Sequence, residues 1–188
     1  MARAESGHVF EVTIGNYVFD CAPDGLPSLF GDYVKRAAFV DSVDIDQRPR
    51  CCLTVGRLGY GWPLAVIAFH AEPMGCAGFH PGMLFVPDTH CLFVGGGTKI
   101  FAYDLSKPAR LRQDDAECGF WFWRQHGDVV VMGAECEFAA WTTTGEKLWT
   151  TFVDPPWEYK VIDDVVHVTC DMLGERAFSL RNGPSGAR

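Results

Sequence analysis

The pattern of apolar and polar residues predicts two different elements before residue 50. Residues 8–20 form β-rich runs on either side of Gly15-Asn16, a pair suited to a tight hairpin turn. Further on, apolar side chains recur at helical spacing, at Leu26, Leu29, Phe30, Tyr33, Val34, Ala37 and Ala38. Pro27 suits the first turn of a helix. We therefore expect a hairpin and then one short amphipathic helix at about 27–38.

After residue 50 the pattern changes to short strands and turns that repeat. Four β-rich runs end in alanine followed by an aromatic residue, at Ala68-Phe69, Ala102-Tyr103, Ala140-Trp141 and Ala177-Phe178. A second β-rich run lies upstream of each, at 52–55, 91–94, 129–132 and 165–169. In the first three units the expected turn between the two runs starts with glycine, at Gly56, Gly95 and Gly133. The aromatics lie 34, 38 and 37 residues apart, a spacing typical of repeat proteins.

Further strands are expected on both sides of these hairpins. They precede three of them, at 83–86, 120–124 and 157–161, and follow two, at 109–112 and 146–152. Four short antiparallel strands in each unit are typical of a β-propeller blade.

Two segments resemble known β-propeller repeats. Residues 100–105, Ile-Phe-Ala-Tyr-Asp-Leu, are similar to the inner hairpin strand of quinoprotein-type and WD-type repeats. Residues 144–149, Thr-Gly-Glu-Lys-Leu-Trp, are similar to the Thr-Gly-x-x-x-Trp ending of quinoprotein-type repeats. The resemblance concerns single repeats within residues 50–181, and the Trp-Asp dipeptide is absent. It implies a fold rather than a function, because propellers carry many unrelated activities.

We therefore expect an all-β chain with one short helix, built from antiparallel β-meander repeats. About four units fit the length, which predicts a small or partial propeller-like array; a two-sheet β-sandwich is the alternative. Residues 1–181 are expected to form a single domain, with the hairpin and helix at 8–38 and the repeats at about 50–181. Residues 182–188, rich in Gly, Pro and Ser, are expected to be a flexible tail.

Composition limits the kinds of partner and the compartment. A net charge of -8 argues against nucleic-acid binding, and no apolar run is long enough for a membrane helix. Residues 1–10 lack the apolar core of a secretory signal. The eight cysteines form no Cys-x-x-Cys pair, and most lie in apolar runs. We expect reduced thiols and a cytoplasmic protein.

One segment combines residue types that bind zinc or copper. Its members are His70, Cys76, His80, His90 and Cys91. Their spacing matches no standard ligand pattern, so no cofactor is expected, and a metal- or ligand-binding protein is kept as the alternative.

A continuous aromatic run, Phe120-Trp121-Phe122-Trp123, lies on one expected strand. Alternation predicts the two Phe side chains on one face and the two Trp side chains on the other. Packing against neighbouring blades would explain why both faces carry large aromatic side chains. If one face is open, Trp121, Trp123 and Trp157 would form an aromatic binding surface.

The leading functional hypothesis is a non-enzymatic binding or interaction module. Its partner would be a protein, or a second copy of the chain in a homodimer, contacted through sheet edges and aromatic faces. No nucleic acid or membrane partner is expected. A further alternative is a small enzyme that uses His80, His90 or His126 as a base in a pocket lined by loops.

Overall fold

The first sheet contains the N-terminal third of the chain. The computed structural model describes residues 10–23, 25–47, 50–71 and 80–185. The strands of the first sheet are β1 (Phe10–Ile14), β2 (Tyr17–Ala22), β3 (Phe39–Val43), β4 (Arg50–Arg57) and β5 (Ala65–His70), with helix α1 (Phe30–Arg36) between β2 and β3. Their order is β1-β2-β4-β5-β3, antiparallel except that β3 pairs parallel with β5.

Three further sheets follow, each a meander whose strands pair in chain order. The second sheet is β6 (Gly82–Val86), β7 (Cys91–Gly96), β8 (Lys99–Asp104) and β9 (Ala109–Asp115). The third is β10 (Phe120–His126), β11 (Val129–Ala134), β12 (Glu137–Thr142) and β13 (Lys147–Phe152). The fourth has three strands, β14 (Trp157–Ile162), β15 (Val165–Cys170) and β16 (Gly174–Ser179).

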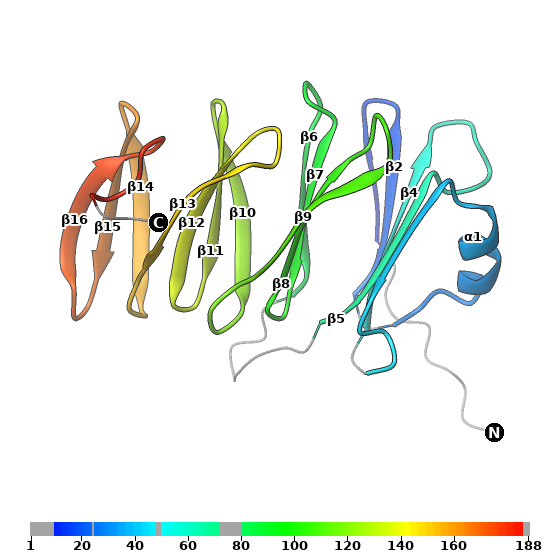
Figure 1. Cartoon of the computed structure of the whole chain (residues 1–188), viewed down its shortest axis with the longest axis horizontal. Coiled ribbons are helices and arrows are strands. Elements are labelled where there is room, and N and C mark those ends of the chain that lie inside the picture. The colour runs from blue at the N-terminus through cyan, green and yellow to red at the C-terminus, as the bar shows by residue number, and fades with distance from the viewer. Residues whose placement is uncertain (1–9, 24, 48–49, 72–79, 186–188) are drawn as a thin grey trace.

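The four sheets stack face to face in an open row, with the first and fourth sheets at opposite ends (Figure 1). Three buried apolar clusters fill the spaces between successive sheets, around Phe19 and Phe101, around Phe93 and Trp141, and around Phe138. This is a propeller-like array of four units, as expected, and not a two-sheet sandwich.

The repeat predicted from sequence is confirmed strand by strand. The four Ala-aromatic pairs lie on β5, β8, β12 and β16, and each of these strands pairs with the β-rich run upstream of it. The N-terminal hairpin is also confirmed, with Gly15 at φ +58° in its turn. The helix forms but is shorter than expected, because the backbone is already extended at Ala37.

None of the three repeat glycines begins a turn, contrary to expectation, and Gly56 lies within β4 with room for a Cβ. Gly95 and Gly133 lie within β7 and β11 and do not begin the turns. A Cβ on Gly95 would lie 2.5 Å from the Phe120 ring, and the ring of Phe122 crowds Gly133 in the same way. Glycine is therefore needed there because aromatic side chains of β10 pack against the backbone.

The predicted alternation of the aromatic run is wrong at one point. The pairing of β10 with β11 shifts between Phe120 and Phe122, which indicates a β-bulge. As a result Phe120 and Trp123 both pack towards the second sheet, whereas Phe122 packs towards the fourth. One extra residue thus separates two side chains that strict alternation places together.

The outer faces of the two end sheets are finished differently. On the first sheet, α1 and the residues beside it cover a buried patch made of Ala22, Cys52, Val66 and Ala68. On the fourth sheet the outward positions are largely polar and exposed, including Glu158, Lys160, Thr169 and Glu175. No helix among the described residues is long and apolar enough to span a membrane.

Candidate functional site: a groove on the first sheet

The three tryptophans proposed from sequence do not share one surface. Trp123 is only 8% exposed, within the cluster between the second and third sheets. Trp121 and Trp157 stack with ring centroids 5.4 Å apart and planes 9° from parallel. The Trp157 Nε1–H donates to the carbonyl oxygens of Ala134 and Glu135, at 3.2 and 3.1 Å. The structure therefore pairs Trp121 with Trp157 and places Trp123 apart from them.

The described members of the His/Cys segment do not converge. His80 precedes β6 and His90 follows it, so the two lie at opposite ends of that strand. The His90 Nδ1 lies 3.3 Å from the Tyr17 hydroxyl, and His70 ends β5. Cys76 lies outside the described residues. Within the described part of the chain, no three His, Cys, Asp or Glu side chains form a group that could hold a metal ion.

Cys91 is a buried member of that segment, at the start of β7. Burial, together with the nearby charge of Asp104, raises the pKa of its thiol to about 12, so the thiol is protonated at neutral pH.

A groove of about 320 Å³ lies on the outer face of the first sheet, beside α1. We call it the end groove. Its floor is made of outward side chains of β1, β2 and β4, arranged in rows across the strands. In one row Glu11 lies opposite Asp20, and Asp20 lies opposite Thr54. The floor is therefore polar, in contrast to the neighbouring half of the same face, which lies under the helix.

The wall of the end groove is aromatic and comes from the β4–β5 loop and α1. Tyr60 is 76% exposed and Trp62 is 42% exposed, and Leu58 is exposed beside them. The Arg36 guanidinium carbon lies 3.9 Å from the centre of the Trp62 ring, and Tyr33 meets this ring edge-on at 6.3 Å. These contacts hold Trp62 in place, whereas Tyr60 presents most of its surface to solvent.

The floor carries two carboxylates on directly opposed positions. Like charges directly opposite each other on antiparallel strands destabilise the pair, as do Glu11 and Asp20 here. Among the described residues, neither carboxylate takes part in an ion pair, and Asp20 accepts a 3.5 Å hydrogen bond from Thr54. Arg57 also lines the groove, with its guanidinium carbon 5.9 Å from the Tyr17 ring centre. The floor can thus accept a cation between two carboxylates.

A larger cavity of about 530 Å³ lies at the rim of the second to fourth sheets, but its central charge is already paired. The buried Glu137 carboxylate accepts from the Glu117 N–H at 3.0 Å and the Thr150 hydroxyl at 2.6 Å. The Lys147 ammonium lies 3.4 Å from Glu137 and 2.8 Å from Asp114. These contacts join adjacent sheets, so a structural role accounts for the network and no ligand is needed to explain it.

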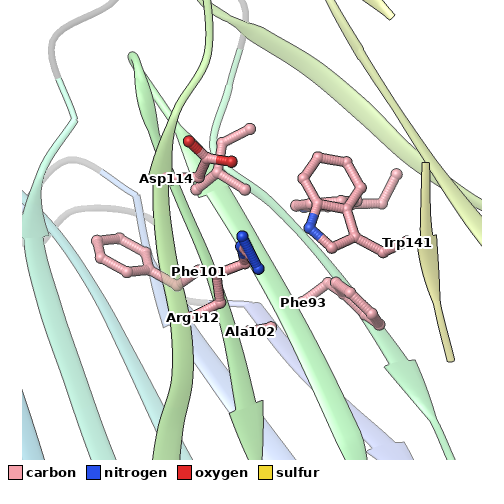
Figure 2. Close-up of a pocket in the computed structure, with 8 residues that line it drawn as sticks. Phe93, Phe101, Ala102, Arg112, Asp114 and Trp141 are labelled. Carbon is pink, nitrogen blue, oxygen red and sulfur yellow. The ribbon is translucent and has the colours of Figure 1, made fainter. Parts of the chain in front are cut away.

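Figure 2 shows a third depression, where Arg112 and Asp114 of β9 lie across from the Trp141 indole. Phe93 and Ala102 lie beneath them, and there is no room for a water molecule. This crevice is a packing feature.

Sequence reasoning missed the end groove, although a signal was present. The β4–β5 loop reads Arg57-Leu-Gly-Tyr-Gly-Trp62, with large apolar side chains separated by glycines. Glycine-rich loops lie at surfaces, so aromatic residues within one indicate an exposed patch. The acidic pair could be found only after the β1–β2 register was known.

Comparison with known proteins gives similarity to solved structures only. No protein-family model and no curated protein matches the chain. BamB from Moraxella catarrhalis is 11% identical over 98% of this chain and 62% of its own, with a TM-score of 0.46. Hsv2 from Kluyveromyces lactis is 12% identical over 56% and 33% of the two chains, with a TM-score of 0.32. A eukaryotic initiation factor is 10% identical over 72% and 37%, with a TM-score of 0.39. The chain thus spans less than two thirds of each of these proteins.

Proposed function

We propose that this chain is a non-enzymatic interaction module that binds a basic segment of a protein partner in the end groove. The observation that carries the proposal is the opposed pair Glu11 and Asp20 on the groove floor. A lysine or arginine side chain between the two carboxylates would relieve their repulsion and gain charge-assisted hydrogen bonds.

The aromatic wall supports a protein segment rather than a free ion as the occupant. Protein interfaces concentrate binding energy in exposed Tyr, Trp and Arg side chains beside a pocket. Tyr60, Trp62 and Arg57 have this arrangement at the end groove. Aromatic rings also bind cations, as the Arg36 guanidinium over Trp62 illustrates within the chain itself.

The shape of the groove suits an extended segment. Its floor runs across three strands and its wall stands on one side, next to α1. A segment lying along the wall would place apolar groups against Tyr60 and basic groups over Glu11 and Asp20. The overall charge of -8 would also draw a basic partner towards the chain.

The test is a binding titration with a defined probe. A fluorescein-labelled peptide of alternating lysine and glycine is titrated with the whole chain, and anisotropy is recorded. We expect Glu11→Gln with Asp20→Asn to weaken binding about tenfold or more, since hydrogen bonds to charged groups contribute about 1.5–3 kcal/mol each.

The matched control removes two carboxylates at the far end of the row. Glu158→Gln with Glu175→Gln changes the net charge equally on the exposed face of the fourth sheet. This control should bind the peptide nearly as well as the unaltered chain. Equal weakening by both double variants, or no binding by the unaltered chain, would contradict the proposal. Tyr60→Ala should weaken a leucine-lysine peptide more than the glycine-lysine peptide, because only the former has apolar groups for the wall.

A further inference from the structure

Two cysteines meet at the rim between the second and third sheets. Cys118 lies in the connection from β9 to β10, and Cys136 lies in the turn from β11 to β12. Between them the Glu135 N–H donates to the Gly119 carbonyl oxygen at 3.0 Å. The residue before Gly119 is Cys118 and the residue after Glu135 is Cys136, so this backbone bond, next to the Phe120–Ala134 pair of β10 and β11, brings the two cysteines side by side.

These thiols differ from the other described cysteines in their access to solvent. Cys118 is exposed and Cys136 is half-buried, and both are free thiols. The remaining described cysteines, Cys21, Cys51, Cys52, Cys91 and Cys170, are buried. Among the described residues, a small reagent in solution therefore meets Cys118 first, with the half-buried Cys136 on the adjacent segment.

We propose that Cys118 and Cys136 are a reversible oxidation site that forms an intramolecular disulfide by exchange with a small-molecule disulfide. In the first step the Cys118 thiolate attacks the reagent, breaks its S–S bond, forms a mixed disulfide and releases one thiol. In the second step the Cys136 thiolate attacks the Cys118 sulfur and releases the second thiol. Overall, two protein thiols are oxidised and one small disulfide is reduced to two thiols.

The surroundings of the pair fix the order of attack and the slow step. Burial, the contact with Cys118 and the carboxylates of Glu135 and Glu117 raise the pKa of Cys136 to about 11. Little Cys136 thiolate is present at neutral pH, so this residue is the second attacker. The disulfide should form faster as the pH rises towards 11.

The disulfide would further restrain the β9–β10 connection, which several hydrogen bonds already hold in place. The Ala116 and Phe120 N–H groups donate to Thr98 and Gly97 of the β7–β8 turn, each at 2.7 Å. The Glu117 N–H donates to the buried Glu137 carboxylate. A covalent link from Cys118 to Cys136 would hold the second sheet's connection to the third sheet at this rim, next to the 530 Å³ cavity.

The experiment treats the full chain with oxidised glutathione and follows intact mass and disulfide-linked peptides over time. We expect a Cys118–Cys136 link with the loss of two hydrogen atoms, reversed by dithiothreitol. Cys136→Ser should stop at glutathione attached to Cys118, and Cys118→Ser should form neither product. A stable glutathione adduct on the unaltered chain, no reaction, or a link between other cysteines would overturn the proposal.

A second variant tests the electrostatic control without removing a thiol. Glu135→Gln should speed the second step about threefold for each unit by which the Cys136 pKa falls, since nucleophilicity falls as thiolate abundance rises. Glu158→Gln on the fourth sheet is the matched control and should leave the rate unchanged. An unchanged rate in Glu135→Gln would show that Cys136 is not the limiting nucleophile, against the proposed order.

Discussion

The first and fourth sheets are built on the same repeat but end the row in opposite ways. Ala68 and Ala177 occupy the same place in the Ala-aromatic pair of their sheets and both point away from the row. Ala68 is 0% exposed, because α1 and its neighbours cover it. Ala177 is exposed, in a row with His167 and Lys160.

The difference shows two ways in which the last sheet of a stack avoids exposing an apolar face to solvent. One end covers an apolar patch with a helix, and the other replaces apolar residues with polar ones. Only the first sheet has a groove on its outer face. The helix α1 covers one part of that face, and the uncovered part is the end groove. Neither end presents the wholly apolar face that would require a second copy of the chain, so self-association stays a prediction.

The largest expected effect comes from the same substitution at the two equivalent alanines. Ala68→Asp should cost about 4 kcal/mol of unfolding free energy or more, because it buries an unpaired charge beneath α1. Ala177→Asp should change the free energy by no more than about 0.5 kcal/mol, since it lies at an exposed position opposite His167. Urea unfolding of both variants measures the difference. Similar costs at the two sites would mean that the two end faces are not distinct.

A smaller loss of unfolding free energy should follow from removing one side chain that packs between α1 and the first sheet. Phe30 is half-buried and packs against the patch under α1. Phe30→Ala should cost about 2 kcal/mol, less than a fully buried phenylalanine, and the better helix propensity of alanine offsets part of this. Ile162→Ala, on the exposed face of the fourth sheet, should cost at most about 0.5 kcal/mol. A Phe30→Ala cost as small as that of Ile162→Ala would show that α1 adds little to this end.

Much of the fold could be predicted from sequence because the repeat is local. The Ala-aromatic pairs and the runs upstream of them are short, apolar and regularly spaced, so each hairpin is visible on its own. Strand β3 (Phe39–Val43) was missed, since its pairing with β5 is parallel and formed across a long connection. Its Asp41 accepts from the Tyr103 hydroxyl at 3.0 Å and from Arg110, contacts that no local pattern indicates.

The candidate site could be predicted far less well, because it depends on register. The bulge at Phe120 to Phe122 separates Trp123 from Trp121, although the four residues read as a regular strand. Glu11 and Asp20 lie nine positions apart and become opposed only through the β1–β2 pairing. A one-residue change in register would turn either side chain to the other face.

The smallest expected effect tests the inner face of the fourth sheet, which packs on the third sheet and contrasts with its polar outer face. His126 ends β10, and its Nε2 lies 3.1 Å from the Tyr159 hydroxyl of β14. Burial, and then the charge of Arg124, lowers the pKa of His126 below 6.5. The unfolded chain therefore binds more protons between that lowered pKa and about 6.5. Stability should be full above about pH 6.5 and should fall as the pH falls through this window.

In His126→Asn this part of the decline should disappear, whereas Tyr159→Phe removes the contact but keeps the titrating group. The check is urea unfolding at closely spaced pH values, and identical pH profiles for His126→Asn and the unaltered chain would show that His126 titrates alike in the folded and unfolded states.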